Sequence, residues 1–75
     1  MIPRERLINK LRRDLKYEYS RETDKIQEYK KKGGTHRIHL RRKGDFSVEY
    51  ARQVLGSCGC TEEEINRFIG QTQTY

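Results

Sequence analysis

The segment from Thr35 to Arg42 constrains the fold more than any other part of the chain, because polar and apolar residues alternate through its centre. One side of an extended chain would carry His36, Ile38, Leu40 and Arg42, and the other Thr35, Arg37, His39 and Arg41. A repeat of two residues is typical of a half-buried β-strand, here with a basic outer side. We therefore expect a sheet that includes residues 35–42.

The partner of this strand is expected directly before it. Gly33-Gly34 is a typical tight turn, and it predicts a hairpin between strands at 26–32 and 35–42. Upstream of the hairpin, Tyr17 and Tyr19 alternate as in a strand, whereas apolar spacings of three and four between residues 8 and 29 would instead extend one long helix. Turn-forming polar residues favour a break, namely Ser20, Thr23 and Asp24. We expect at least two antiparallel strands and keep the long helix as the alternative.

Helices are predicted on both sides of the strands. Pro3 suits a first helical turn, and the leucines and isoleucine that follow form one apolar stripe, so a first helix is expected from Pro3 to Leu15. Ser47 can cap a second helix over Val48–Cys58, and Gly59 is placed to end it.

A short third helix is expected after Thr61, because Thr61 and Glu64 form a capping box. A chain of 75 residues with 32% hydrophobic residues can bury only a small core, so we expect one domain over residues 1–70 and a flexible tail over 71–75. The predicted class is α+β, with helices packed on one face of a two- or three-stranded antiparallel sheet.

The net charge of +6 is concentrated in the middle of the chain. Residues 30–43 hold seven basic side chains and no acidic ones, which predicts nucleic acid as the partner, with a merely solvated face as the alternative. No apolar stretch is long enough to span a membrane, and the charged N-terminus does not resemble a signal peptide, so we expect a cytoplasmic location.

Short motifs resemble the HicA family of toxin ribonucleases. They are Gly34-Thr35-His36 after a basic run, and the later stretch EYARQVLGSCGCTEEEINRF, so the resemblance covers about residues 30–68. It implies a fold similar to the double-stranded RNA-binding domain, cleavage of mRNA, and an antitoxin partner that covers the active face. The family has its motif soon after the first helix, so here the additional strand would lie earlier in the chain.

The resemblance also implies a catalytic residue, and the basic run supplies the candidates for binding. His36 would be the catalytic residue of an endoribonuclease that needs neither a metal nor another cofactor, and histidine suits this chemistry because its ordinary pKa of about 6.5 lies near working pH. Residues expected to bind the nucleic acid are Lys30, Lys31, Lys32, Gly33, Gly34, Thr35, Arg37, His39, Arg41, Arg42 and Lys43.

Each of these residues also has a simpler interpretation. His36 can be a histidine at the edge of the core, and Gly33-Gly34 only a hairpin turn. Three tyrosines, Tyr17, Tyr19 and Tyr29, can stack on bases or complete the core. Cys58 and Cys60 are better explained as small buried side chains than as metal ligands or a disulfide. A non-catalytic nucleic-acid-binding module is therefore the alternative to the ribonuclease.

Overall fold

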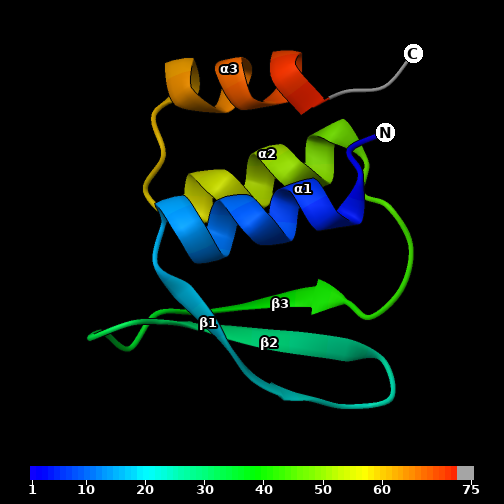
Figure 1. Ribbon diagram of the computed structural model, residues 1–75, viewed down its shortest axis with the longest axis vertical. Helices are drawn as coiled ribbons and strands as arrows, with labels where there is room; N and C mark the ends of the chain where they lie inside the picture. Colours follow the sequence, from blue (N-terminus) through cyan, green and yellow to red (C-terminus); the bar gives the residue numbers. More distant parts are fainter. Residues whose placement is uncertain (73–75) are drawn as a thin grey trace. The chain divides into compact units, whose positions relative to one another are not determined.

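A computed structural model describes residues 1–72 as an α+β fold. In chain order the elements are α1 (Arg4–Asn9), the π-helical η1 (Lys10–Asp14), β1 (Tyr17–Glu22), β2 (Ile26–Lys31), β3 (Arg37–Arg41), α2 (Val48–Ser57) and α3 (Glu62–Thr72) (Figure 1). The chain divides into two compact units, and the division falls within α1. We call residues 8–44 the sheet unit, and residues 1–7 with those from 45 onward the helical unit.

The three strands of the sheet unit form one antiparallel sheet with β2 in the middle. In β3 the burial pattern alternates, with Ile38 and Leu40 buried between exposed neighbours, which confirms the strand predicted from the sequence. The hairpin is also confirmed, because β2 and β3 pair antiparallel. Its turn is longer than the two glycines predicted: the Lys31 N–H bonds the His36 carbonyl across it, and Gly33 adopts a φ of 73° within it. A left-handed φ of this kind favours glycine, since it has no Cβ.

The alternative of one long helix is wrong. The helix ends after η1, where the Leu15 N–H bonds the Lys10 carbonyl, and Lys16 then takes a φ of 61°. A left-handed residue cannot continue a right-handed helix, so the chain turns and enters β1 at Tyr17. One strand of the sheet, β1, thus precedes the Gly-Thr-His motif.

In the helical unit, a short antiparallel bridge joins the N-terminal residues to the segment before α2. Ile2 and Phe46 exchange two hydrogen bonds, of 2.7 and 2.9 Å, and both side chains are fully buried. The guanidinium of Arg4 lies over the Phe46 ring, which stacks on Tyr50. Apolar side chains of the two helices complete the buried interior: Ala51, Val54, Leu55, Ile65, Phe68 and Ile69.

The predicted caps of α2 and α3 are confirmed. The Ser47 hydroxyl accepts a hydrogen bond from the Tyr50 N–H, and Gly59 has a φ of 89° where α2 ends. Thr61 and Glu64 bond each other's backbone N–H groups reciprocally, at 3.0 and 3.2 Å. α3 is longer than predicted and continues through Thr72, whose hydroxyl donates to the Phe68 carbonyl. The helix therefore includes the first two residues of the expected tail, and the remaining residues, 73–75, lie outside the described part of the chain.

Among residues 1–72, none of the helices combines the length and the apolar character needed to cross a bilayer.

Replacing Thr61 with Ala should lower the free energy of unfolding by about 1 kcal/mol, because the orphan N–H of Glu64 loses its acceptor. Thr61→Ser keeps the hydroxyl and should remain near wild type. Urea denaturation followed by circular dichroism measures both. Equal stabilities for the Ala and Ser variants would show that the capping hydroxyl contributes nothing.

Candidate nucleic-acid interface

His36 lies in the sheet unit between the glycine turn and β3, and its side chain is exposed. Its Nδ1 is hydrogen-bonded to the hydroxyl of Tyr17, the first residue of β1, at 2.5 Å. The two rings meet edge to face, with their centroids 5.8 Å apart. Because the Tyr17 side chain is buried, the bond attaches an exposed histidine to a fixed point of the fold.

The sheet register explains this contact. Tyr17 pairs with Lys31 across β1 and β2, and the Lys31 N–H bonds the His36 carbonyl across the turn. Side chains at paired positions share a face of the sheet, so the three form one row. The Lys31 ammonium lies over the Tyr17 ring, 5.4 Å from its centroid. A cation thus stands beside the histidine's partner on the same face.

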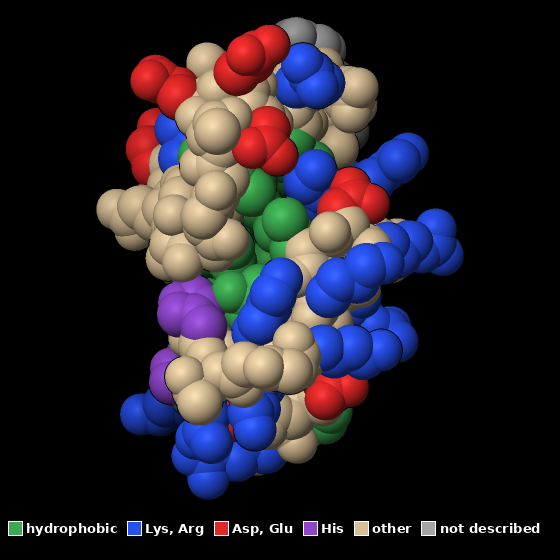
Figure 2. All heavy atoms as spheres, turned by 90° about the vertical axis from the view of Figure 1, so that its left-hand side faces the viewer, with side chains coloured by type: hydrophobic (Ala, Val, Ile, Leu, Met, Phe, Trp, Pro, Cys, Tyr) green, Lys and Arg blue, Asp and Glu red, His purple; other side chains and the backbone are tan. Residues whose placement is uncertain are grey.

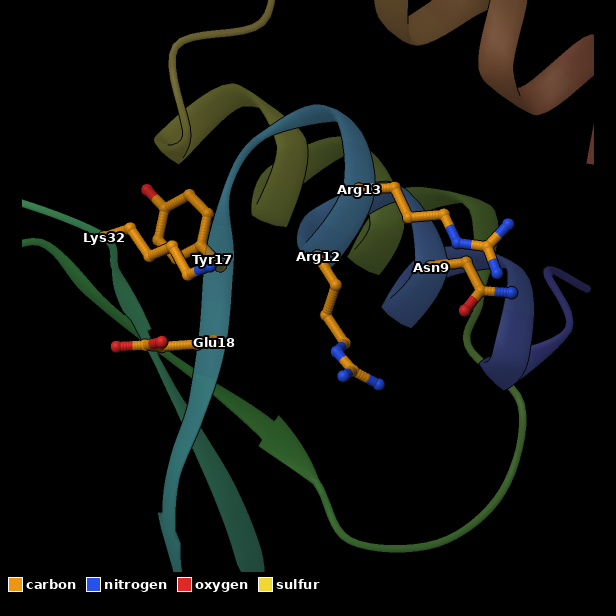
Figure 3. Close-up of a pocket in the computed structure, with 6 residues that line it drawn as sticks. All are labelled: Asn9, Arg12, Arg13, Tyr17, Glu18 and Lys32. Atoms are coloured by element: carbon orange, nitrogen blue, oxygen red, sulfur yellow. The ribbon is translucent and has the colours of Figure 1, made fainter.

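A basic pocket of about 330 Å³ adjoins Tyr17. Its lining comes from the helix, from β1 and from the end of β2: Asn9, Arg12, Arg13, Tyr17, Glu18 and Lys32. Figure 3 shows Arg12 reaching into the space between the helix and β1, with Asn9 and Arg13 projecting from the helix. The pocket thus links residues from distant parts of the sequence to the partner of His36.

The pocket has the charge of an anion site. It has three basic side chains against one acidic one, Glu18, and within residues 1–72 none of the three forms an ion pair. Cations that are not neutralised by the protein are available to a phosphate group. Of the three, sequence analysis singled out only Lys32, and it missed Arg12 and Arg13 because nothing in their spacing indicates that the chain folds back beside them.

Other predicted binding residues lie on the opposite side of the sheet. Arg37, His39 and Arg41 are the exposed, alternating positions of β3, and Ile38 and Leu40 between them are buried. Figure 2 shows lysine and arginine side chains crowding the part of the molecule that the strands form, with histidine side chains on the same view. The prediction of a basic outer side for this strand is therefore confirmed.

A buried carboxylate lies under this basic side. Glu28, in the central strand, has a side chain only 4% exposed, and its Oε1 and Oε2 lie 3.0 Å from His39 Nε2 and 3.5 Å from Arg21 Nε. The hydrogen bond from His39 lowers the pKa of Glu28 below its usual range, against the opposing effect of burial, and the charge of Arg21 contributes further. The ionised Glu28 can only accept hydrogen bonds, so His39 Nε2 carries a proton and donates it.

A β-bulge makes the second of these contacts possible. The register of β1 and β2 shifts between Tyr19 and Arg21, so Arg21 rather than Ser20 pairs with Glu28. Bulges redirect side chains in this way. The burial of Glu28 could not be predicted from the sequence, because an acidic residue at an outward strand position is ordinarily solvated.

The remaining predicted residues divide between the ends of the hairpin. Gly33, Gly34 and Thr35 form the exposed turn near His36, and Lys30 and Lys31 are half-buried in β2. Arg42 pairs with Glu22 at 3.1 Å, and Arg42 and Lys43 line a second basic pocket beyond the far end of β3. The predicted set therefore does not form a single cluster.

Of the three tyrosines considered for base stacking, Tyr17 and Tyr29 are buried and serve the core. Tyr19 is 50% exposed and leans edge-on against Tyr29. Its hydroxyl donates to Glu22, and this hydrogen bond raises the pKa of Tyr19. Cys58 and Cys60 are half-buried thiols rather than the halves of a disulfide.

No family model matches this chain, and no curated protein or solved structure matches it significantly. The likeness to HicA toxins therefore rests on the short motifs alone.

Replacing Glu28 with Gln should lower the free energy of unfolding near neutral pH and matter less in acid. The folded-state pKa of Glu28 lies below the ordinary value of 4.5, so its stabilising effect is complete above that value and is lost as the pH falls through the folded pKa. Urea unfolding of both proteins at a series of pH values from about 7 to about 3 measures the difference. The contributions of the other carboxylates to the pH dependence are the same in both proteins, so they cancel in the difference. A difference that is constant or grows toward acid pH would contradict the ionised, hydrogen-bonded state of Glu28.

Proposed function

We propose that the protein binds RNA and cleaves it without a metal ion, with His36 as the general base. The observation that carries this proposal is the hydrogen bond between the buried Tyr17 and His36, next to a pocket with three unneutralised cations. An oriented histidine and a phosphate site are the parts that such a reaction requires.

The chemistry assigns a role to each group. His36 takes the proton of a ribose 2′-hydroxyl, the 2′-oxygen bonds to the adjacent phosphorus, and the bond from phosphorus to the 5′-oxygen breaks, leaving a 2′,3′-cyclic phosphate. Water returns a proton to the departing 5′-oxygen. Arg12, Arg13 and Lys32 stabilise the negative charge that develops on the phosphate oxygens.

Tyr17 acts as a positioning residue. When the His36 Nδ1–H donates to the Tyr17 oxygen, the lone pair of Nε2 is left to accept the proton of the substrate. The other tautomer would place the proton on Nε2 and remove the base. Anchoring by the buried phenol therefore sets the direction of the ring, and the mechanism uses the tautomer in which Nδ1 donates and Nε2 reacts.

The resemblance to HicA toxins adds a cellular role and a protein partner to the proposal. An mRNA-cleaving enzyme of this kind acts in the cytoplasm and arrests translation, and an antitoxin protein would silence it by covering the face that holds His36. The basic pocket offers such a partner a site for acidic side chains.

His36→Ala should reduce cleavage of labelled mRNA in the presence of EDTA by about a hundredfold or more, the usual contribution of a general base. Added imidazole should restore part of the rate to this variant. Binding of a 2′-O-methyl RNA, measured by gel retardation, should stay near wild type. This RNA lacks the 2′-hydroxyl that would attack the phosphate, so it can be bound but not cleaved. The control is Arg67→Ala, an exposed position of α3 in the helical unit. Cleavage that survives in His36→Ala would refute the assignment.

Tyr17→Phe keeps the buried ring and removes only the hydroxyl, so it should lower kcat by less than His36→Ala does, leave KM little changed and alter the pH profile of cleavage. Stopped-flow cleavage across a range of pH checks this. An unchanged profile with unchanged kcat would show that the phenol does not position the histidine.

The double variant Arg12→Ala with Arg13→Ala should lower kcat/KM by about tenfold or more, because the pocket loses two of its three cations. The matched control removes two arginines from the helical unit, Arg52 and Arg67, both exposed. Equal losses of kcat/KM in both double variants would show that the loss reflects the overall charge of the protein and not the pocket.

A second candidate function has its own supporting observation. The exposed basic side of β3 lies on the face opposite to Tyr17 and contains no part of the His36 site, so it suits a module that holds nucleic acid without cutting it. Gel retardation of mRNA without cleavage by the wild type would favour this module over the ribonuclease.

A further inference from the structure

The polar face of the sheet unit is defined by the side chains that the register places opposite to the buried tyrosines and Ile38. It consists of Glu18, Arg21, Ile26, Glu28, Lys30, Arg37, His39 and Arg41. Five cross-strand pairs of the register fall on it, joining Glu18 to Lys30, Lys30 to Arg37, Arg21 to Glu28, Glu28 to His39 and Ile26 to Arg41. With five cationic or histidine side chains against two acids, one of them buried, this face is complementary to a polyanion.

The row along β3 has a regular spacing. Arg37, His39 and Arg41 occupy every second position, are all exposed, and therefore follow one another at about 6.6 Å, twice the rise of a strand residue. Successive phosphates of an extended single strand are separated by a similar distance. The phosphates of an A-form duplex curve away from a straight row, and duplexes are contacted across their minor groove instead.

Glu28 fixes the middle side chain of this row. Its carboxylate accepts the 3.0 Å hydrogen bond of His39 and also pairs at 3.5 Å with Arg21, which lies outside the row. The proton on His39 Nε2 is used by the carboxylate, so the ring stands at a set angle between its two arginine neighbours. A side chain that is already fixed loses less conformational entropy when a ligand binds.

The row continues into the second basic pocket. This pocket, of about 330 Å³, lies beyond the end of β3 and is lined by Asp24, Lys25, Arg41, Arg42 and Lys43. It contains four basic side chains and one acidic one. Arg41 belongs to both the row and the pocket, so a chain of phosphates that follows β3 can pass directly into it.

We propose that the polar face binds the sugar–phosphate backbone of single-stranded RNA along β3, from Arg37 through His39 to the pocket at Arg41. Phe, Tyr and Trp side chains are missing from the residues that define this face and the His39 ring is held by Glu28, so the face offers charge for the backbone and little for stacking on bases. The proposal rests on the proposed function for RNA as the ligand, but not on cleavage, because His36 and Tyr17 belong to the other face.

The test measures binding of a 2′-O-methyl RNA oligonucleotide by fluorescence anisotropy at several salt concentrations. For Arg37→Ala with Arg41→Ala, the slope of log affinity against log salt should fall by about 1.4, which is 0.7 for each lost phosphate contact. Arg37→Lys with Arg41→Lys keeps both charges and should keep most of the slope. Arg52→Ala with Arg67→Ala removes the same charge from the helical unit and should leave the slope unchanged.

Oligonucleotides of different sequence should bind the wild type equally, and a duplex of the same length should bind more weakly. An unchanged slope in the Arg37 and Arg41 alanine variant, tighter binding of the duplex, or binding of an acidic peptide in place of RNA would each overturn the proposal. Because the methylated RNA cannot be cut by its 2′-oxygen, a wild type that binds it but cleaves no mRNA refutes the proposed ribonuclease and leaves this inference standing.

Discussion

The carboxylate of Glu28 is the interaction on which the sheet unit depends most. It lies in the middle strand with almost no exposed surface, and it contacts Arg21 from one neighbouring strand and His39 from the other. Burying a charge is unfavourable unless partners replace its water, and here the replacement ties all three strands together. The β-bulge beside Ser20 is part of the same arrangement, because it redirects Arg21 onto the acid.

Much of this architecture could be predicted from local signals. The alternation around Ile38 and Leu40, the paired glycines and the Thr61 capping box are each decided within a few residues, and all three are found as expected. The extent of α3 was less accessible, because no local signal in the sequence indicates that the helix continues to Thr72, whose hydroxyl donates to the Phe68 carbonyl.

The site was harder to foresee, for a physical reason. Tyr17 and His36 are 19 positions apart in sequence, and the Arg12 pocket depends on a turn at Lys16 that needs a left-handed lysine. No residue pattern around Glu28 indicates that its side chain is buried or which charges it meets. Alternation predicts which way a side chain points, but only the register of the neighbouring strands decides which charges meet.

The two histidines illustrate how differently one residue type can be used. His39 donates to an ionised acid that fixes its protonated nitrogen, whereas His36 has the hydroxyl of a buried tyrosine as its partner. The two histidines lie on opposite faces of the sheet. In the functions proposed above, holding and cutting RNA therefore fall on different surfaces, and a substitution on one face can remove one activity without the other.

The π-helical segment at Lys10–Asp14 has a consequence for how such a chain arises. A π turn contains one residue more than an α turn, and Arg12 and Arg13 lie within it. The extra residue widens the turn locally, so deleting one residue there would restore the ordinary α-helical repeat and move the two arginines relative to the rest of the helix. The lining of the pocket would change, although every strand would be intact. The pocket is thus the kind of feature that one inserted codon can create and one deleted codon can erase.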